Sequence, residues 1–252
     1  MFLPLFGIIA GFIDSIAGGG GLITLPVLTL AIEAGPHAIG SNKIVGTVGA
    51  LTALLVYLRK HPFPWKSSLG FMIGIVLGSF TGSIISPLID KKFFNWILLG
   101  VSPLILWLVI KRDSLIRGIQ HPPTGDQRAH FKHQLKILIS GLLCGIYDGA
   151  LGPGGGTFML LALIFANGLP LFQALVLSKL ANTLSAGTSL LSYAEQGYVH
   201  WREGSLVAGG MLIGAFLGST LATKRAEKIV RPMLIVVVTL FMIRISYEIM
   251  HS

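Results

Sequence analysis

Two runs of glycine are the residues whose type and spacing could do chemistry in this sequence. Residues 18–21 are all glycine, residues 152–156 read Gly-Pro-Gly-Gly-Gly, and long apolar stretches surround both runs. Each glycine destabilises a helix by about 1 kcal/mol relative to alanine, so a helix should break at each run. The helix that follows a break presents free N–H groups and a partial positive charge, which together form an anion site. A kink that allows tight packing is the alternative interpretation.

Four charged residues in apolar surroundings accompany the glycine runs. Asp14 and Asp148 each lie four residues before a run, and Lys43 and Lys179 each lie near the start of the next apolar segment. Charged side chains inside a membrane are energetically unfavourable and usually functional. The lysines could bind an anion held at the helix N-termini, or reach the membrane surface from a helix end. The aspartates could pair with the lysines, cap the broken helices or carry a proton that couples transport.

These residues define a candidate anion site. The predicted substrate-binding residues are Gly18, Gly19, Gly20, Gly21, Asn42, Lys43, Gly152, Gly154, Gly155, Gly156, Lys179 and Asn182. The predicted coupling residues are Asp14 and Asp148, and neutral hydrogen bonds could come from Ser41, Thr47, Ser178 and Thr183. We expect no metal, cofactor or catalytic set, because Cys144 is the only cysteine and the histidines are not spaced as a metal site.

The composition places this candidate site in a membrane protein. Of 252 residues, 53% are hydrophobic and 12% are charged, against about 25% charged in an ordinary soluble domain. The mean hydropathy of +0.78 is too high for a soluble surface. The net charge of +9 lies in short loops, where Lys and Arg set topology and contact lipid headgroups. We therefore expect an all-α, multi-pass protein of the plasma membrane. Its expected partner is the lipid bilayer, and we expect no binding of nucleic acid.

Eight apolar segments predict the helices that position the site. They cover residues 2–32, 44–58, 67–89, 93–110, 135–166, 171–194, 204–222 and 230–247. The polar stretch 111–134 carries five Lys and Arg residues together with Pro122, Pro123 and Gly125, which indicates a loop. The predicted domains are a first transmembrane repeat over 1–110, a basic cytoplasmic loop over 111–134 and a second transmembrane repeat over 135–252.

The two halves of the chain repeat each other. With a shift of 134, the residues Gly7, Gly11, Asp14, Gly18, Gly20, Gly21 and Pro36 fall on Gly141, Gly145, Asp148, Gly152, Gly154, Gly155 and Pro170. With a shift of 136, the residues Lys43, Thr47, Thr52, Tyr57 and Trp65 fall on Lys179, Thr183, Thr188, Tyr193 and Trp201. Apolar helices resemble one another by chance, but matched Asp, Lys, Tyr and Trp residues do not. The sequence therefore predicts a duplication.

The positions of Lys and Arg favour inverted halves over parallel ones. An odd number of crossings in each half would place the basic residues of 224–231 on the cytoplasmic side with the 111–134 loop, as the positive-inside rule prefers. We therefore expect inverted repeats with both termini outside, each with a glycine-broken first element and three spanning helices. Whether that first element spans the membrane or is re-entrant stays open.

A further glycine pattern predicts close helix packing. The residues Gly74, Gly78 and Gly82 repeat every four positions, as do Gly210, Gly214 and Gly218. This spacing leaves a bare stripe on one helix face, where another backbone can approach. A pore-lining or dimer-forming face is the alternative, so a homodimer also stays open.

The sequence resembles the TauE/SafE family of sulfite exporter-like permeases. The resemblance lies in the glycine-rich breaks, in Ser178-Lys179-Leu180-Ala181-Asn182 and in the segment from Tyr193 to Trp201, and it extends over nearly the whole chain. The first half departs from the pattern, with Ala17 in place of the leading glycine and Ser41-Asn42-Lys43 in place of Ser-Lys. The resemblance implies transport of a small sulfur-containing anion such as sulfite, thiosulfate or an organosulfonate.

The leading functional hypothesis is a secondary transporter with its anion between the two glycine breaks, working by alternating access. The sequence contains no G-x-x-x-x-G-K-[ST] motif, so we expect no ATP-driven transport within this chain. The alternatives are a membrane-embedded enzyme that uses the aspartates as acid and base, and a passive anion channel. Transport direction and coupling ion are left open.

Overall fold

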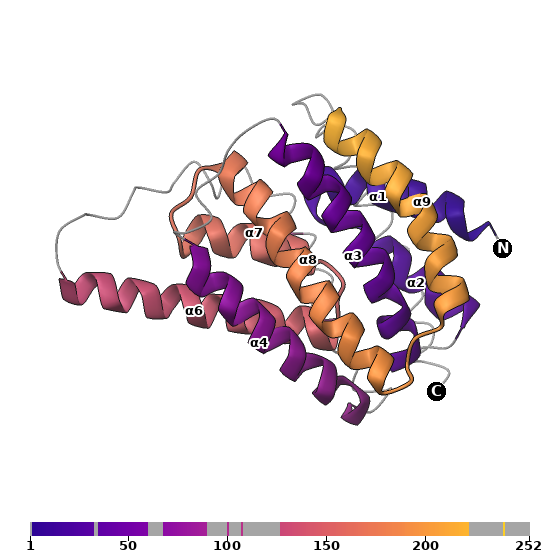
Figure 1. The fold of residues 1–252 in the computed structure, drawn as a ribbon, viewed down its shortest axis with the longest axis horizontal. Coiled ribbons are helices and arrows are strands. Elements are labelled where there is room, and N and C mark those ends of the chain that lie inside the picture. Colours follow the sequence, from indigo (N-terminus) through magenta and orange to yellow (C-terminus); the bar gives the residue numbers. More distant parts are fainter. Residues whose placement is uncertain are drawn as a thin grey trace.

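The computed structural model describes residues 2–32, 35–59, 68–89 and 127–221, with Gly100, Trp107 and Thr239 as isolated positions. All regular structure in these residues is helical. In chain order the helices are α1 (Leu3–Ala17), α2 (Gly21–Ala31), α3 (Pro36–Leu58), α4 (Leu69–Ile85) with the 3-10 turn η2 (Ser86–Leu88), α6 (Gln127–Ala150), α7 (Gly155–Phe165), α8 (Leu171–Glu195) and α9 (Trp201–Thr220) (Figure 1). Apart from the isolated positions, the predicted segments 93–110 and 230–247 lie outside the described residues.

The helices break at the two glycine runs, as the sequence predicts. Helix α1 ends at Ala17, and Gly18 follows with a φ of 81°. Helix α6 ends at Ala150, and Gly152 and Gly154 have φ values of 94° and 73° before α7 begins. Glycine adopts these positive φ values without the steric clash of a Cβ atom. The breaks therefore follow from local backbone chemistry.

The glycine stripes bring two pairs of helices into backbone contact, which confirms the packing prediction. A Cβ atom added to Gly210 of α9 would lie 1.9 Å from the carbonyl oxygen of Pro4 in α1. A Cβ atom added to Gly74 of α4 would lie 2.4 Å from the carbonyl oxygen of Leu138 in α6. In Figure 1, α4 lies along α6 and α1 lies beside α9. Each close pair thus joins one helix from the first half of the chain to one from the second.

Helices α3 and α8 run between these pairs and belong to two hydrophobic clusters. The first cluster combines α1, α2 and α9 with the N-terminal part of α3, with Tyr193 of α8 and with Ala150 and Leu151 at the end of α6. The second combines α4, α7 and Ile137 of α6 with residues 53–57 of α3 and 174–181 of α8. The packing is therefore crossed, since each cluster draws on both halves of the sequence.

The exterior of the helices is apolar, whereas several polar side chains are buried. Exposed apolar side chains on α4 and α9 include Leu69, Ile73, Leu77, Phe80, Ile84, Leu206, Leu212, Ile213, Phe216 and Leu217. An apolar surface of this extent is unusual on a soluble protein and suits contact with lipid. Within the described residues, Pro36–Leu58 and Leu69–Leu88 are long and apolar enough to cross a membrane.

Three helices begin at least three residues before the position that the sequence predicts. Helix α3 begins at Pro36, whereas the apolar segment begins at residue 44. Helix α6 begins at Gln127, inside the range 111–134 predicted as a loop. Helix α9 begins at Trp201, slightly before the predicted 204. In each case the helix extends into polar residues that a hydropathy pattern does not include.

Candidate anion-binding site

A cavity lies between the two glycine breaks and holds about 410 Å³ of empty space, its open mouth included. Its lining residues are Asp14, Gly18, Gly21, Thr24, Asn42, Lys43, Gly46, Asp148, Gly152, Gly154, Gly155, Gly156, Asn182, Ala186 and Met211. They come from both halves of the chain. The fold therefore brings together two sequence motifs that are more than a hundred residues apart.

Most of the predicted site residues line this cavity, and three do not. Gly19 and Gly20 lie outside the lining, and the Gly20 N–H donates a hydrogen bond to the Asp14 carboxylate at 3.0 Å. Lys179 also lies outside it, and its ammonium group contacts Asp14. The predicted neutral donors Ser41, Thr47, Ser178 and Thr183 donate to carbonyl oxygens of their own helices instead and are not among the lining residues.

Four lining residues were not predicted from the sequence. Thr24 lies in the first turn of α2, and Met211 and Ala186 are apolar residues of α9 and α8 without a chemical signature. Gly46 carried a signal, since the shift of 136 places it on Asn182. The repeat therefore could have identified Gly46, whereas the other three depend on how the helices pack.

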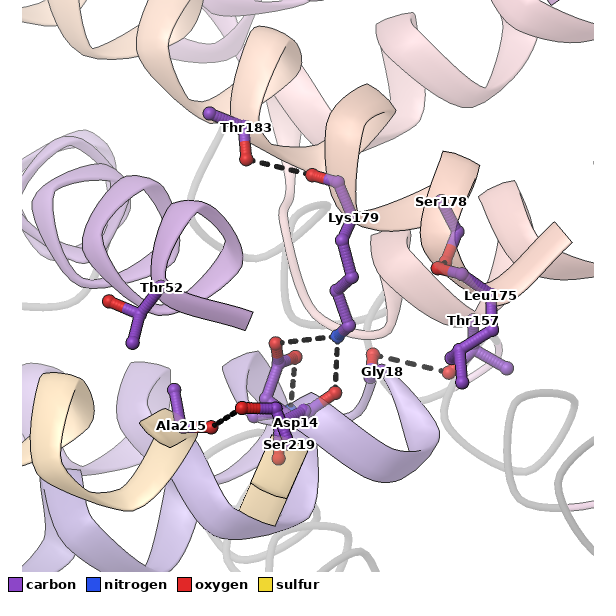
Figure 2. A network of polar contacts seen from close by, with 12 residues as sticks. Asp14, Gly18, Thr52, Thr157, Leu175, Ser178, Lys179, Thr183, Ala215 and Ser219 are labelled. Atoms are coloured by element: carbon purple, nitrogen blue, oxygen red, sulfur yellow. Dashed lines mark hydrogen bonds and ion pairs between the residues drawn. The ribbon is translucent and has the colours of Figure 1, made fainter. Parts of the chain in front are cut away.

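Lys179 and Asp14 form the first of two buried ion pairs (Figure 2). The Lys179 Nζ atom lies 2.9 Å from Asp14 Oδ2, and it also donates to the Asp14 backbone carbonyl oxygen. The two side chains are 1% and 6% exposed. Asp14 Oδ1 accepts the hydrogen bond from Gly20, at the start of the turn that leads into α2. This pair joins α8 of the second half to α1 of the first.

Lys43 and Asp148 form the second pair, with the halves exchanged. The Lys43 Nζ atom lies 3.0 Å from Asp148 Oδ2 and also donates to the Asp148 backbone carbonyl oxygen. Asp148 Oδ2 accepts a further hydrogen bond of 2.6 Å from the Ser185 hydroxyl. The side chains are 4% and 5% exposed, so neither lysine reaches the membrane surface. Of the alternatives left open by the sequence, the structure has the lysines paired with the aspartates.

Amide groups of two asparagines face the glycine breaks. The Asn42 Nδ2 atom lies 3.8 Å from the position of a Cβ atom on Gly21, and Asn42 Oδ1 accepts a 2.6 Å hydrogen bond from the Thr24 hydroxyl. The Asn182 Nδ2 atom lies 3.4 Å from the Cβ position of Gly156. Asn182 is 8% exposed and has no hydrogen-bond partner in the part of the chain that the structure describes. These neutral N–H groups are the donors that a small anion in the cavity could reach.

Residues 3–245 match the family model described as sulfite exporter TauE/SafE. The chain belongs to the TauE/SafE family. A probable membrane transporter protein of Haemophilus influenzae is 31% identical over 250 residues, which cover 96% of this chain and 92% of that protein. The probable membrane transporter protein YfcA of Escherichia coli K12 is 31% identical over 242 residues, covering 95% and 87%. The probable membrane transporter protein YunE of Bacillus subtilis is 26% identical over 267 residues, covering 98% and 97%.

No solved structure matches the chain. The family and its relatives establish the general class: the protein is a membrane transporter of the TauE/SafE type. The relatives are named as transporters, which agrees with the expectation that the chain is not an enzyme. Two residues of the first half depart from the family pattern: Asn42 lines the cavity, and Ala17 is the last residue of α1.

Proposed function

We propose that this TauE/SafE protein is a secondary transporter that moves a small anion, such as sulfite, thiosulfate or an organosulfonate, across the plasma membrane. The anion binds in the cavity between the two glycine breaks. The observation that carries this proposal is the convergence there of two helix N-terminal segments and the unpartnered amide of Asn182. Helix N-termini bind anions through free N–H groups and the helix dipole.

Alternating access would exchange the side from which the cavity opens. The crossed packing suggests which parts move: α1, α2 and α9 share one hydrophobic cluster, and α4, α6 and α7 meet in the other. The cavity lies between these groups, with α3 and α8 contributing to both. We propose that these groups move relative to each other, rather than the first half of the sequence relative to the second. Inverted repeats with both termini outside are part of the same proposal.

Asp14 and Asp148 are the candidate coupling residues. Both line the cavity and both are paired with a lysine. Protonation of either carboxylate would weaken its ion pair, and this change could link proton movement to the opening of the cavity. The crossed pairs suit such a role, because each one joins the two hydrophobic clusters through the helices that carry it.

A ligand-stabilisation screen tests the binding site. A bound anion raises the apparent melting temperature of the purified protein by mass action. We expect stabilisation by at least one of sulfite, thiosulfate or a small sulfonate, and loss of that stabilisation in Asn182→Ala. Asn167→Ala is the matched control, because Asn167 does not line the cavity and donates to the Ser68 hydroxyl at 3.1 Å. Equal ligand affinity in the two variants would show that the anion does not bind at Asn182.

Reconstitution into liposomes tests transport itself. We expect saturable uptake that is accelerated by unlabelled anion on the opposite side, because a carrier must return its site across the membrane. Flux without saturation or counter-transport would indicate a channel. Chemical conversion of the anion by the purified protein would indicate an enzyme.

A further inference from the structure

The charged groups of the cavity are paired with one another. Asp14, Asp148 and Lys43 are its charged lining residues, and Lys179 lies behind Asp14. The two ion pairs use both lysines and both aspartates, so their formal charges sum to zero. Among the described lining residues there is no further Lys, Arg or His. An anion in this cavity therefore meets no unpaired cation.

The remaining positive potential comes from the helix N-termini. Helix α7 begins at Gly155 and helix α2 at Gly21, and both residues line the cavity. Each helix N-terminus is equivalent to about half an elementary positive charge. Two of them supply about one positive charge in total, and the C-termini of α1 and α6, which end at the same glycine runs, offset part of it. A second negative charge would have no counterpart and would lie near two carboxylates.

The neutral donors support the same site independently of the helix ends. Asn182 is more than nine-tenths buried, lines the cavity and directs its unpartnered amide toward the start of α7. Among the described residues this amide has no hydrogen-bond partner, so its N–H groups are available to a ligand in the cavity. The Nδ2 group of Asn42 approaches the first glycine run, 3.8 Å from the Cβ position of Gly21, and both residues belong to the first half of the chain. Neutral amides add hydrogen bonds but no charge.

We infer that the cavity selects monoanions over dianions of the same shape. This inference rests on the proposed function and specifies its substrate class: an oxyanion that carries one negative charge, such as a sulfonate or a singly protonated sulfur oxyanion. A dianion would enter only in its singly protonated form. Size alone does not make this distinction, since methanesulfonate and sulfate are both small tetrahedral sulfur compounds.

The test compares methanesulfonate, a monoanion, with sulfate, a dianion, on the wild-type protein. Dissociation constants come from the dependence of the apparent melting temperature on ligand concentration, at neutral pH and equal ionic strength. We expect methanesulfonate to bind at least tenfold more tightly, which is about 1.4 kcal/mol. Equal or tighter binding of sulfate would overturn the inference and leave the proposed function standing. If no anion in the screen binds, the proposed function fails, and the inference with it.

A charge variant tests whether the negative charge of the cavity lining is the reason that sulfate binds more weakly than methanesulfonate. Asp148→Asn removes one negative charge from the lining, so we expect the preference for methanesulfonate over sulfate to fall at least tenfold. Asp14→Asn removes one negative charge on the other side of the cavity, and it replaces Asp148→Asn in the test if that variant does not fold. Glu203→Gln is the control, because it removes a negative charge near His200, away from the cavity lining. An unchanged preference in the folded aspartate variants would overturn the inference.

Discussion

The ion pair between Lys179 and Asp14 gives the sharpest prediction for stability. The Nζ and Oδ2 atoms are 2.9 Å apart, and the side chains are 1% and 6% exposed. At an effective dielectric constant of about 20, this separation corresponds to about 6 kcal/mol of Coulomb attraction, from which the desolvation of both groups must be subtracted. Lys179→Met keeps most of the length of the side chain and removes its charge, which leaves the buried Asp14 carboxylate without its cationic partner.

Such a change should destabilise the protein by about 3–5 kcal/mol, the usual effect of removing one member of a buried pair. The double variant Asp14→Asn with Lys179→Met should recover most of this loss. The amide oxygen introduced by Asp14→Asn would still accept the Gly20 N–H hydrogen bond, and the backbone carbonyl oxygen at this position would keep the Gly18 N–H as donor. Neither substitution changes Lys43 or Asp148, so the loss of stability in the single variant and its recovery in the double variant both report on the Lys179–Asp14 pair.

The assay is reversible unfolding in mixed micelles, with the free energy of unfolding taken from a titration with denaturing detergent. Lys179 does not line the cavity, but its partner Asp14 does, so the titration is carried out without ligand. Wild-type stability in Lys179→Met would refute the buried pair. If the double variant is no more stable than the single variant, the uncompensated Asp14 carboxylate is not the cause of the lost unfolding free energy.

Three further predictions concern packing, hydrogen bonding and coupling. Gly210→Ala should lower the melting temperature, because overpacking costs about 1–3 kcal/mol. Gly209→Ala is the control and should not lower it, because no atom lies within 4 Å of a Cβ atom at this position. Equal melting temperatures in the two variants would contradict the close contact of α1 and α9. Tyr193→Phe should destabilise by about 1 kcal/mol in unfolding titrations, because its hydroxyl donates to a carbonyl oxygen of α6 at 2.9 Å; no loss would argue against that bond. Asp14→Asn and Asp148→Asn should each reduce uptake driven by a pH gradient in proteoliposomes; undiminished uptake in both would exclude these residues as proton carriers.

The sequence predicted the helix breaks because they depend on local chemistry, and most of the residues that it proposed for the site line the cavity. Gly18 and Gly152 have positive φ angles, which glycine can adopt at a helix end without steric clash. The glycine stripes of α4 and α9 predicted close packing for the same reason, since a missing Cβ is visible in the sequence. In these cases the residue type alone carries the structural information.

The partners of the charged residues could not be predicted, because spacing does not say which helices meet. Lys43 lies closer in sequence to Asp14 than to Asp148, yet it pairs with Asp148 across the halves. The hydropathy pattern predicts a start at residue 44 for the helix that begins at Pro36, for a related reason. A hydropathy pattern assumes that polar residues avoid the membrane, whereas Asn42 and Lys43 lie inside the protein and meet other polar groups there.

The scaffold of the site follows the repeat, but its neutral donors do not. The shifts of 134 and 136 convert the Lys43–Asp148 pair into Lys179–Asp14, and the hydrogen bond from Tyr57 to Ser15 into that from Tyr193 to Gly149. The same shift places Asn42 on Ser178 and Asn182 on Gly46, so the amides have no repeat partners.

This difference has a physical reason. Two conformations that exchange the roles of the halves need equivalent contacts in each half, and the ion pairs and tyrosines provide them. A sulfite or sulfonate ion between the halves has a three-fold axis but no two-fold axis, so it cannot form equivalent hydrogen bonds to both halves. Natural selection on transport would therefore keep the supporting contacts matched while the donors that touch the anion diverge. On this reasoning, substitutions at Asn42 and Asn182 should alter which anion binds, and substitutions in the paired contacts should alter how the protein moves.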